Sequence, residues 1–225
     1  MSDRLLVFDM DGVLVDVSDS YREAIRATVA HFAGQEITRE QIQDYKNQGG
    51  WNDDWALSHH LITSSGVSVP YQAVVNYFQA IFHGDGTNGL ILRERWIAQD
   101  GLFERLGRRF QLAVFTGRLR WEAELTLNRF SSASSFRPII GADDIERLKP
   151  APDGLLRIRE LAGGKDLWYV GDTVDDARSA RSAGAPFIGI AAPSNPRRQQ
   201  LLSLFTAEQA LAVLDDINQL EMVLP

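Results

Sequence analysis

Short apolar runs of strand length recur along the chain, and amphipathic segments separate them. Runs that lack polar alternation suit strands buried on both faces, and helical segments between them supply the crossovers of a parallel sheet. The pattern therefore predicts an α/β fold with a mostly parallel sheet. The five runs that predict strands are residues 5–8, 112–115, 138–140, 167–170 and 187–190.

The interval between the first two runs has a different character. About a hundred residues lie there, too many for one crossover, and apolar residues recur at helical spacing over 21–32 and 74–81. We expect a helical domain at residues 17–100, inserted into a core built from residues 1–16 and 101–225.

Polar residues mark where further helices begin. Thr38 with Gln41 is typical of a capping box, and residues 52–54 place a cap and negative charge before an apolar segment. Another helix is expected over residues 99–106, where the chain returns to the core.

The C-terminal region supports two interpretations. Residues 210–214 predict a sixth strand, with Asp215 capping a last helix that ends at Leu220. Alternatively, residues 206–221 form a single helix. We prefer the strand.

Composition excludes several classes of protein. Hydrophobic residues make up 44% of the 225 residues and Cys is absent, which argues against disorder, a disulfide scaffold and thiolate chemistry. The net charge of −7 argues against a protein that binds nucleic acid through a cationic surface. The first apolar stretch, residues 5–8, is far shorter than a signal-peptide core or a membrane span, so we expect a cytoplasmic protein without a membrane partner.

Charged and hydroxyl side chains follow the predicted strands. Asp9 and Asp11 come directly after the first strand, and later strands are followed by residues 116–118, Lys149 and residues 171–176. The carboxyl ends of parallel strands meet at one edge of a sheet, where open α/β folds bind ligands. Each motif alone is also typical of a turn, a helix cap or a solvated surface residue, whereas the combination predicts a catalytic site.

The motifs of the chain resemble the four motifs of the haloacid dehalogenase-like (HAD) hydrolase superfamily, in the same order and strand context. They are Asp9-x-Asp11, Thr116, Lys149 and Gly171-Asp172-x-x-x-Asp176. The position of the insert is similar to that of subfamily IA, the phosphoglycolate phosphatase-like group with a helical type 1 cap. The resemblance implies a Rossmann-like three-layer core with an inserted cap domain, and a Mg²⁺-dependent phosphatase that acts on a small phosphorylated metabolite.

The resemblance also implies a role for each motif. Asp9 would attack phosphorus and form an aspartyl-phosphate, which splits one hard displacement into two easier ones. Asp11 would protonate the leaving oxygen and then take a proton from the hydrolytic water. The implied Mg²⁺ ligands are the Asp9 carboxylate, the Asp11 backbone carbonyl and the Asp172 carboxylate. Asp176 would support the ion or Lys149, and Lys149 would neutralise the transferring group.

Further residues are candidates for contacts with the substrate. Thr116 would donate its hydroxyl, and Gly117 its amide, to a phosphoryl oxygen. The candidates beyond the phosphate are Arg118, Lys46 and Asn47. The last two lie in residues 46–52, a polar segment with glycines that we expect to form a loop between two cap helices, where backbone can approach a ligand closely. An ordinary interhelical loop is an equal alternative.

Several alternatives stay open at this point. A phosphomutase of the β-phosphoglucomutase type has the same motifs, and a non-catalytic phospholigand-binding module would keep them without turnover. Haloacid dehalogenases lack the second acid of the first motif, so the presence of Asp11 disfavours them. The identity of the phosphate ester and the choice between monomer and homodimer are also open.

Overall fold

The computed structural model of the chain describes residues 4–131 and 133–225. The chain divides into two compact units, a helical unit of residues 16–95 and a sheet unit that combines the residues up to 15 with those from 96 onward. It passes between the units at β2 (Val15–Asp16) and β3 (Arg95–Trp96), two short strands that pair with each other.

Six parallel strands form the main sheet. They are β1 (Arg4–Phe8), β4 (Gln111–Phe115), β5 (Ile139–Ile140), β6 (Asp166–Gly171), β7 (Phe187–Ile190) and β8 (Ala212–Leu214). Their order in the sheet is β5-β4-β1-β6-β7-β8. Leu6 of β1 pairs with Leu112 on one side and with Trp168 on the other. The strands that follow β1 in the chain lie first on one side of it (β4 and β5) and then on the other (β6, β7 and β8). The carboxyl ends of β1, β4 and β6 therefore meet at a topological switch point, where such sheets bind ligands.

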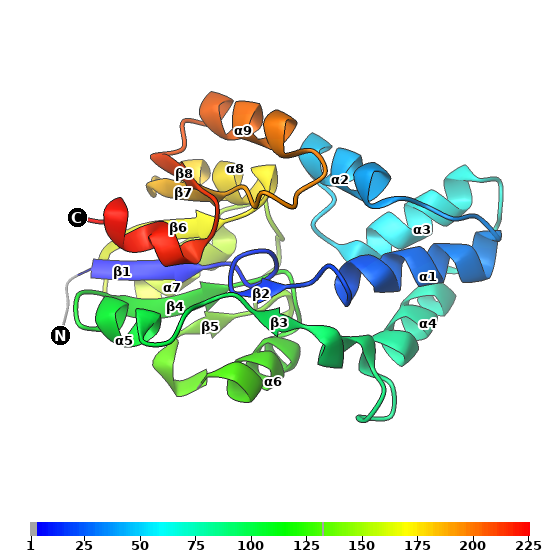
Figure 1. The fold of residues 1–225 in the computed structure, drawn as a ribbon, viewed down its shortest axis with the longest axis horizontal. Coiled ribbons are helices and arrows are strands. Elements are labelled where there is room, and N and C mark those ends of the chain that lie inside the picture. Colours follow the sequence, from blue (N-terminus) through cyan, green and yellow to red (C-terminus); the bar gives the residue numbers. More distant parts are fainter. Residues whose placement is uncertain (1–3, 132) are drawn as a thin grey trace. The chain divides into compact units, whose positions relative to one another are not determined.

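Helices cover both faces of this sheet, with α8 and α9 on one side and α5 and α6 on the other (Figure 1). The bounds are α5 (Leu102–Gly107), α6 (Arg120–Phe130), α7 (Asp153–Leu161), α8 (Val174–Ser182), α9 (Arg198–Ala207) and the 3₁₀ helices η2 (Ala133–Ser135) and η3 (Ala142–Asp144). Alternate side chains of β1 enter different layers. Leu5 and Val7 share a buried cluster with residues of α7, α8 and α9, whereas the Phe8 ring lies 5.6 Å from that of Phe103 in α5. The predicted three-layer α/β core is confirmed.

Four α-helices form the helical unit. They are α1 (Tyr21–Ala33), α2 (Arg39–Gln48), α3 (Asp54–Ser64) and α4 (Tyr71–His83), followed by the 3₁₀ helix η1 (Leu90–Arg93). The predicted capping box is confirmed, because the Gln41 N–H donates to the Thr38 hydroxyl (3.2 Å) and the Thr38 N–H donates to the Gln41 side chain (2.8 Å). The rings of Tyr21 and Phe82 lie 4.1 Å apart and join the first helix to the last. Among the described residues, no helix is both long enough and apolar enough to cross a membrane.

The C-terminal region contains the predicted sixth strand, β8, so the alternative of one helix over residues 206–221 is wrong. The element that follows is a 3₁₀ helix, η4 (Ile217–Met222). Its cap is Asp216, whose side chain accepts a backbone N–H of that helix at 2.7 Å, and not the predicted Asp215. Asp215 instead forms an ion pair with Arg198, at 2.6 Å, which explains why its carboxylate does not cap the helix.

Candidate active site

Strand β1 carries Asp9 to the carboxyl edge of the sheet. The Asp9 N–H donates to the Val170 carbonyl of β6 at 2.8 Å, so sheet pairing fixes the position at which the strand ends. The chain then turns, with Gly12 in the left-handed region at φ 72°. Any Cβ at Gly12 would lie 2.0 Å from Oδ2 of Asp172. A glycine here therefore lets the segments after β1 and β6 approach each other closely.

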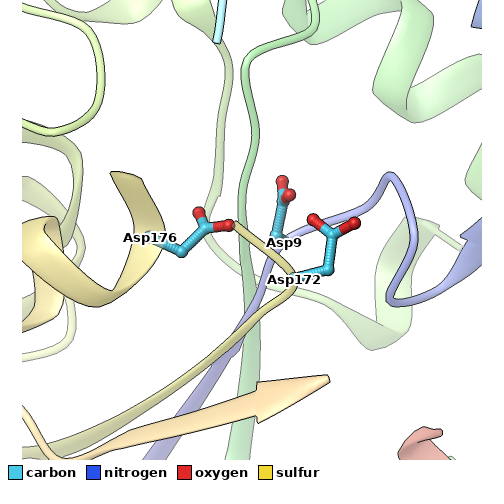
Figure 2. Close-up of side chains that lie close together, drawn as sticks. All are labelled: Asp9, Asp172 and Asp176. Atoms are coloured by element: carbon cyan, nitrogen blue, oxygen red, sulfur yellow. The ribbon is translucent and has the colours of Figure 1, made fainter. Parts of the chain in front are cut away.

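Three carboxylates converge at this edge. Asp9, Asp172 and Asp176 each offer an oxygen, and these oxygens all lie within 4.8 Å of one another. Figure 2 shows Asp9 between the other two, with its carboxylate next to that of Asp172. Asp9 and Asp176 are buried, and Asp172 is half-buried. Like charges at this spacing repel each other, so the arrangement requires positive charge nearby.

Lys149 supplies one positive charge. Its Nζ lies 2.9 Å from Oδ1 of Asp9 and 2.8 Å from Oδ1 of Asp176, and the side chain is 1% exposed. Nζ also lies 4.8 Å from the centroid of the Phe115 ring, whose face attracts a cation. One ammonium beside three carboxylates leaves negative charge in excess.

The pKa values of the site reflect this balance. Burial raises the pKa of Asp9 to about 7, because it outweighs the lowering by Lys149. Burial acts in the same direction on Asp176, but Lys149 and the hydrogen bonds from Thr173 and Tyr169 hold the pKa of Asp176 below its ordinary value. Burial alone would lower the pKa of Lys149, yet Asp176 and Asp9 raise it above its ordinary value. Asp9 is therefore the buried carboxylate whose charge is least compensated.

Two side chains that the sequence pattern does not single out hold Asp176 in place. The Tyr169 hydroxyl donates to Oδ1 of Asp176 at 2.7 Å, and the Thr173 hydroxyl donates to Oδ2 at 2.6 Å. Thr173 also caps α8, since its oxygen accepts the Asp176 N–H. The spacing of Thr173 and Asp176 before a helix is a readable capping signal. No comparable signal distinguishes Tyr169 from the other residues of β6.

Thr116 and Gly117 follow the carboxyl end of β4, beside β1. The Thr116 N–H donates to the Ile140 carbonyl at 3.1 Å, which continues the pairing of β4 with β5. The Thr116 side chain is buried, and its hydroxyl oxygen accepts the Arg118 N–H at 3.2 Å. Gly117 is exposed at this edge.

Arg118 contacts the second acid of the first motif. Its Nε and Nη2 lie 2.7 and 2.6 Å from Oδ1 of Asp11, and its Nη1 donates to the Thr126 hydroxyl at 2.9 Å. The Arg118 side chain is 1% exposed and that of Asp11 25%. The structure therefore holds Asp11 against a buried guanidinium, a pairing that the sequence does not predict. The role of Arg118 as a substrate contact stays a prediction.

Lys46 and Asn47 belong to the helical unit, whereas the other predicted site residues belong to the sheet unit. The expected loop over residues 46–52 is wrong at its start, because its first three residues form the last turn of α2. That turn is held by an ion pair of Lys46 with Asp54 and by a hydrogen bond that Gln43 donates to Asn47 at 2.9 Å. The contact of Lys46 and Asn47 with the substrate stays a prediction.

The oxygen donors at the sheet edge fit a hard divalent cation. Mg²⁺ prefers carboxylate and carbonyl oxygens and is usually bound through one or two carboxylates. The excess negative charge of these carboxylates suits a divalent cation.

The chain is similar to known proteins over most of its length. A family model described as haloacid dehalogenase-like hydrolase matches residues 6–190. An imidazoleglycerol-phosphate dehydratase of Phytophthora nicotianae is 37% identical over 197 residues, which are 84% of this chain but only 43% of that protein. A phosphoglycolate phosphatase of Pseudomonas putida is 22% identical over 228 residues, 96% of this chain and 78% of that protein. The solved structure of phosphatase Tt82 from Thermococcus thioreducens is 26% identical, with a TM-score of 0.64 over 91% of this chain and 99% of that chain.

Proposed function

The chain belongs to the haloacid dehalogenase-like hydrolase family, and from this premise we propose that it is a Mg²⁺-dependent phosphatase that hydrolyses a small phosphomonoester through an aspartyl-phosphate. One observation carries the proposal. The buried Asp9 carboxylate lies 2.9 Å from the Lys149 ammonium and within 4.8 Å of the Asp172 carboxylate. A nucleophile in this position faces a phosphoryl group whose charge the ammonium opposes. The names of the Pseudomonas and Thermococcus relatives support a phosphate ester as the substrate class.

The chemistry uses Asp9 and Asp11 in two steps. A carboxylate oxygen of Asp9 attacks phosphorus, the bond from phosphorus to the ester oxygen breaks, and the Asp11 carboxyl gives its proton to that oxygen. Water then attacks the phosphorus of the aspartyl-phosphate, the bond from phosphorus to the Asp9 oxygen breaks, and Asp11 takes the proton of the water. These steps release an alcohol and inorganic phosphate and restore both side chains.

Thr116 and Lys149 hold the phosphoryl group in place. The Thr116 oxygen accepts the Arg118 N–H, which leaves its hydroxyl hydrogen to donate to a phosphoryl oxygen, and the Gly117 amide would add a second donor. The Lys149 ammonium, buried beside Asp9, opposes the charge of the transferring group without having to reorganise during the reaction.

Three groups would hold Mg²⁺, namely the carboxylates of Asp9 and Asp172 and the backbone carbonyl of Asp11. Asp176 accepts hydrogen bonds from Tyr169 and Thr173 and forms an ion pair with Lys149, which suits a role in fixing Lys149. When bound, the ion neutralises negative charge on the carboxylates and on the phosphoryl group.

Added Mg²⁺ is expected to raise the melting temperature more near pH 8 than near pH 5.5. The pKa of Asp9 is about 7, so a proton occupies this carboxylate at the lower pH and competes with the ion, whereas the carboxylate is ionised at the higher pH. Differential scanning fluorimetry measures the shift. Asp172→Asn is expected to remove the effect of Mg²⁺, and Asp166→Asn, at the exposed start of β6, is expected to keep it. Equal shifts in these two variants would contradict the assigned ligands.

A panel of phosphate esters with Mg²⁺, and again with EDTA, tests the proposed activity by phosphate release. The panel holds phosphoglycolate, sugar phosphates and nucleoside monophosphates, and the name of the Phytophthora relative adds a phosphate ester of an imidazole-bearing alcohol. We expect one ester to reach a kcat/KM on the order of 10⁴ M⁻¹s⁻¹ or more, and EDTA to abolish its hydrolysis. An isomerised sugar phosphate without phosphate release would indicate a phosphomutase, and no reaction at all would reject the phosphatase.

The two units have different proposed roles. All residues used in the chemistry above lie in the sheet unit, which is therefore the proposed catalytic core. The helical unit is the proposed cap domain that selects the substrate, with Lys46 and Asn47 as its candidate contacts.

Arg118 is expected to act through Asp11 as a positioning residue. Arg118→Lys removes the fork that contacts Oδ1 of Asp11, so kcat/KM for an alkyl phosphate should fall about 10²-fold, the effect of a lost general acid. For an aryl phosphate with a good leaving group, which departs without a proton, kcat/KM should fall less than about tenfold. Arg120→Lys, which alters the neighbouring pair with Asp144, is expected to leave both unchanged. Equal losses for the two esters would contradict this role.

A further inference from the structure

A cavity of about 840 Å³ opens at the amino ends of the strands, the edge of the sheet opposite to Asp9. We propose that this cavity binds a small molecule that carries two or more phosphate groups. Its lining contains four basic side chains, Arg108, Arg109, Arg137 and Lys165. No Asp or Glu is among the described residues that line it. Four formal positive charges thus gather at one place on a chain whose net charge is −7.

Two of these cations, Arg108 and Arg137, are exposed. Within residues 4–131 and 133–225, the guanidinium groups of Arg108 and Arg137 form no ion pair and no hydrogen bond. Exposed arginines commonly pair with neighbouring carboxylates, as Arg157 does with Glu160 on α7 in the same unit, at 2.6 Å. The charge of Arg108 and Arg137 is therefore available to an anion that enters the cavity.

The other two cations, Lys165 and Arg109, are held in place by contacts within the protein. The Lys165 ammonium donates to the side-chain oxygen of Gln111 at 2.8 Å, and the Gln111 amide donates to the Arg137 carbonyl at 2.8 Å. The Arg109 guanidinium lies over the Phe110 ring, 5.4 Å from its centroid, and donates to main-chain oxygens at residues 224 and 225. Because Gln111 carries no charge, it orients Lys165 without cancelling its positive charge.

The shape and chemistry of the cavity select a small polyanion. Guanidinium groups present a planar fork that matches two phosphate oxygens, and the lining adds the hydroxyl groups of Ser134 and Ser135. Small-molecule sites commonly measure about 300–1,000 Å³, which includes this cavity. A single phosphate would engage only part of four cations spread around such a volume, so two or more phosphate groups fit better.

The cavity is separate from the candidate active site. Gln111 begins β4, whereas Thr116 follows the last residue of that strand. Five steps along a strand, at about 3.3 Å each, place the two residues about 17 Å apart. An anion in the cavity is therefore out of reach of Asp9 and Lys149, and its binding does not depend on the proposed phosphatase activity.

Isothermal titration calorimetry with inorganic tripolyphosphate, in EDTA and at low salt, tests the proposal on the full chain. We expect one tripolyphosphate per chain, with an affinity that falls as salt is added, since ionic contacts at an exposed site are screened. Arg108→Glu combined with Arg137→Glu is expected to weaken binding at least about tenfold. The control combines Arg157→Glu with Arg181→Glu, which makes the same change of net charge at exposed arginines of the same unit, and is expected to bind within about threefold of the wild type.

Three results would overturn the proposal. The first is no binding of tripolyphosphate to the wild type. The second is binding that survives the Arg108 and Arg137 substitutions but is lost in Lys149→Met, which would place the anion in the candidate active site. The third is tighter binding of a hexaglutamate peptide than of tripolyphosphate, which would assign the cavity to an acidic segment of a protein. Circular dichroism of each variant verifies that it is folded.

Discussion

Lys149→Met is expected to lower kcat by about 10²–10³-fold and to lower the free energy of unfolding by about 3–5 kcal/mol. The ammonium lies within 3 Å of both Asp9 and Asp176 and is 1% exposed, so its removal leaves two buried carboxylates without their counter-charge. Methionine has a similar length and keeps the packing against Phe115. Phosphate release and urea denaturation in the absence of Mg²⁺ measure the two effects.

A second substitution separates the two consequences of removing Lys149. Adding Asp176→Asn to Lys149→Met removes one of the two carboxylate charges left without a counter-charge. The double variant should therefore recover part of the lost free energy of unfolding, while its kcat stays low. Arg198→Met, which breaks the half-exposed pair with Asp215, is the control and is expected to change stability by less than about 1 kcal/mol. An unchanged stability in Lys149→Met would contradict the charge balance described for this site.

Asp9→Asn is expected to lower kcat by at least about 10³-fold without destabilising the protein. The amide has the shape of the carboxylate but cannot form the phosphoryl bond. Burial raises the pKa of Asp9 to about 7, so the ionised form lowers the stability of the folded protein as the pH rises through that value. The uncharged amide removes this penalty, and the melting temperature without Mg²⁺ near pH 8 should equal or exceed that of the wild type.

The comparison of melting temperature with kcat makes the Asp9 prediction specific. A misfolded variant would lose both, whereas a lost nucleophile affects only turnover. Asp215→Asn, at a carboxylate that follows the outermost strand β8 and pairs with Arg198, is expected to keep both values. If Asp9→Asn retained turnover within tenfold of the wild type, another group would have to attack phosphorus.

Much of the fold was predictable because its strands are continuous apolar runs bounded by turn residues. The ten-residue helix α9 was not. Its apolar residues Leu201, Leu202, Leu204 and Phe205 cover little more than one helical turn, and only the first and last of them are buried. Its N-cap, Arg197, makes no side-chain hydrogen bond to the helix, so no capping signal marks its start.

The candidate site was predictable as far as its motifs are local. Asp9 and Asp11, or Asp172 and Asp176, are close in sequence, and the strand that precedes each pair fixes the sheet edge where it lies. The pairing of Arg118 with Asp11 joins positions 107 residues apart and depends on the direction that a long side chain takes inside the folded core. Periodicity and spacing carry no information on such a contact, so only the folded structure reveals it.

The central place of β1 affects how the protein is made. Synthesis produces β1 before the other strands of this sheet, yet Leu6 must find Leu112 on one side and Trp168 on the other. Pairings this distant in sequence close large loops and are slow to form. On the ribosome, the site around Asp9 therefore cannot form until β6 has emerged. A nascent chain that stops before residue 166 leaves one edge of β1 unpaired, and this apolar edge is exposed to other chains.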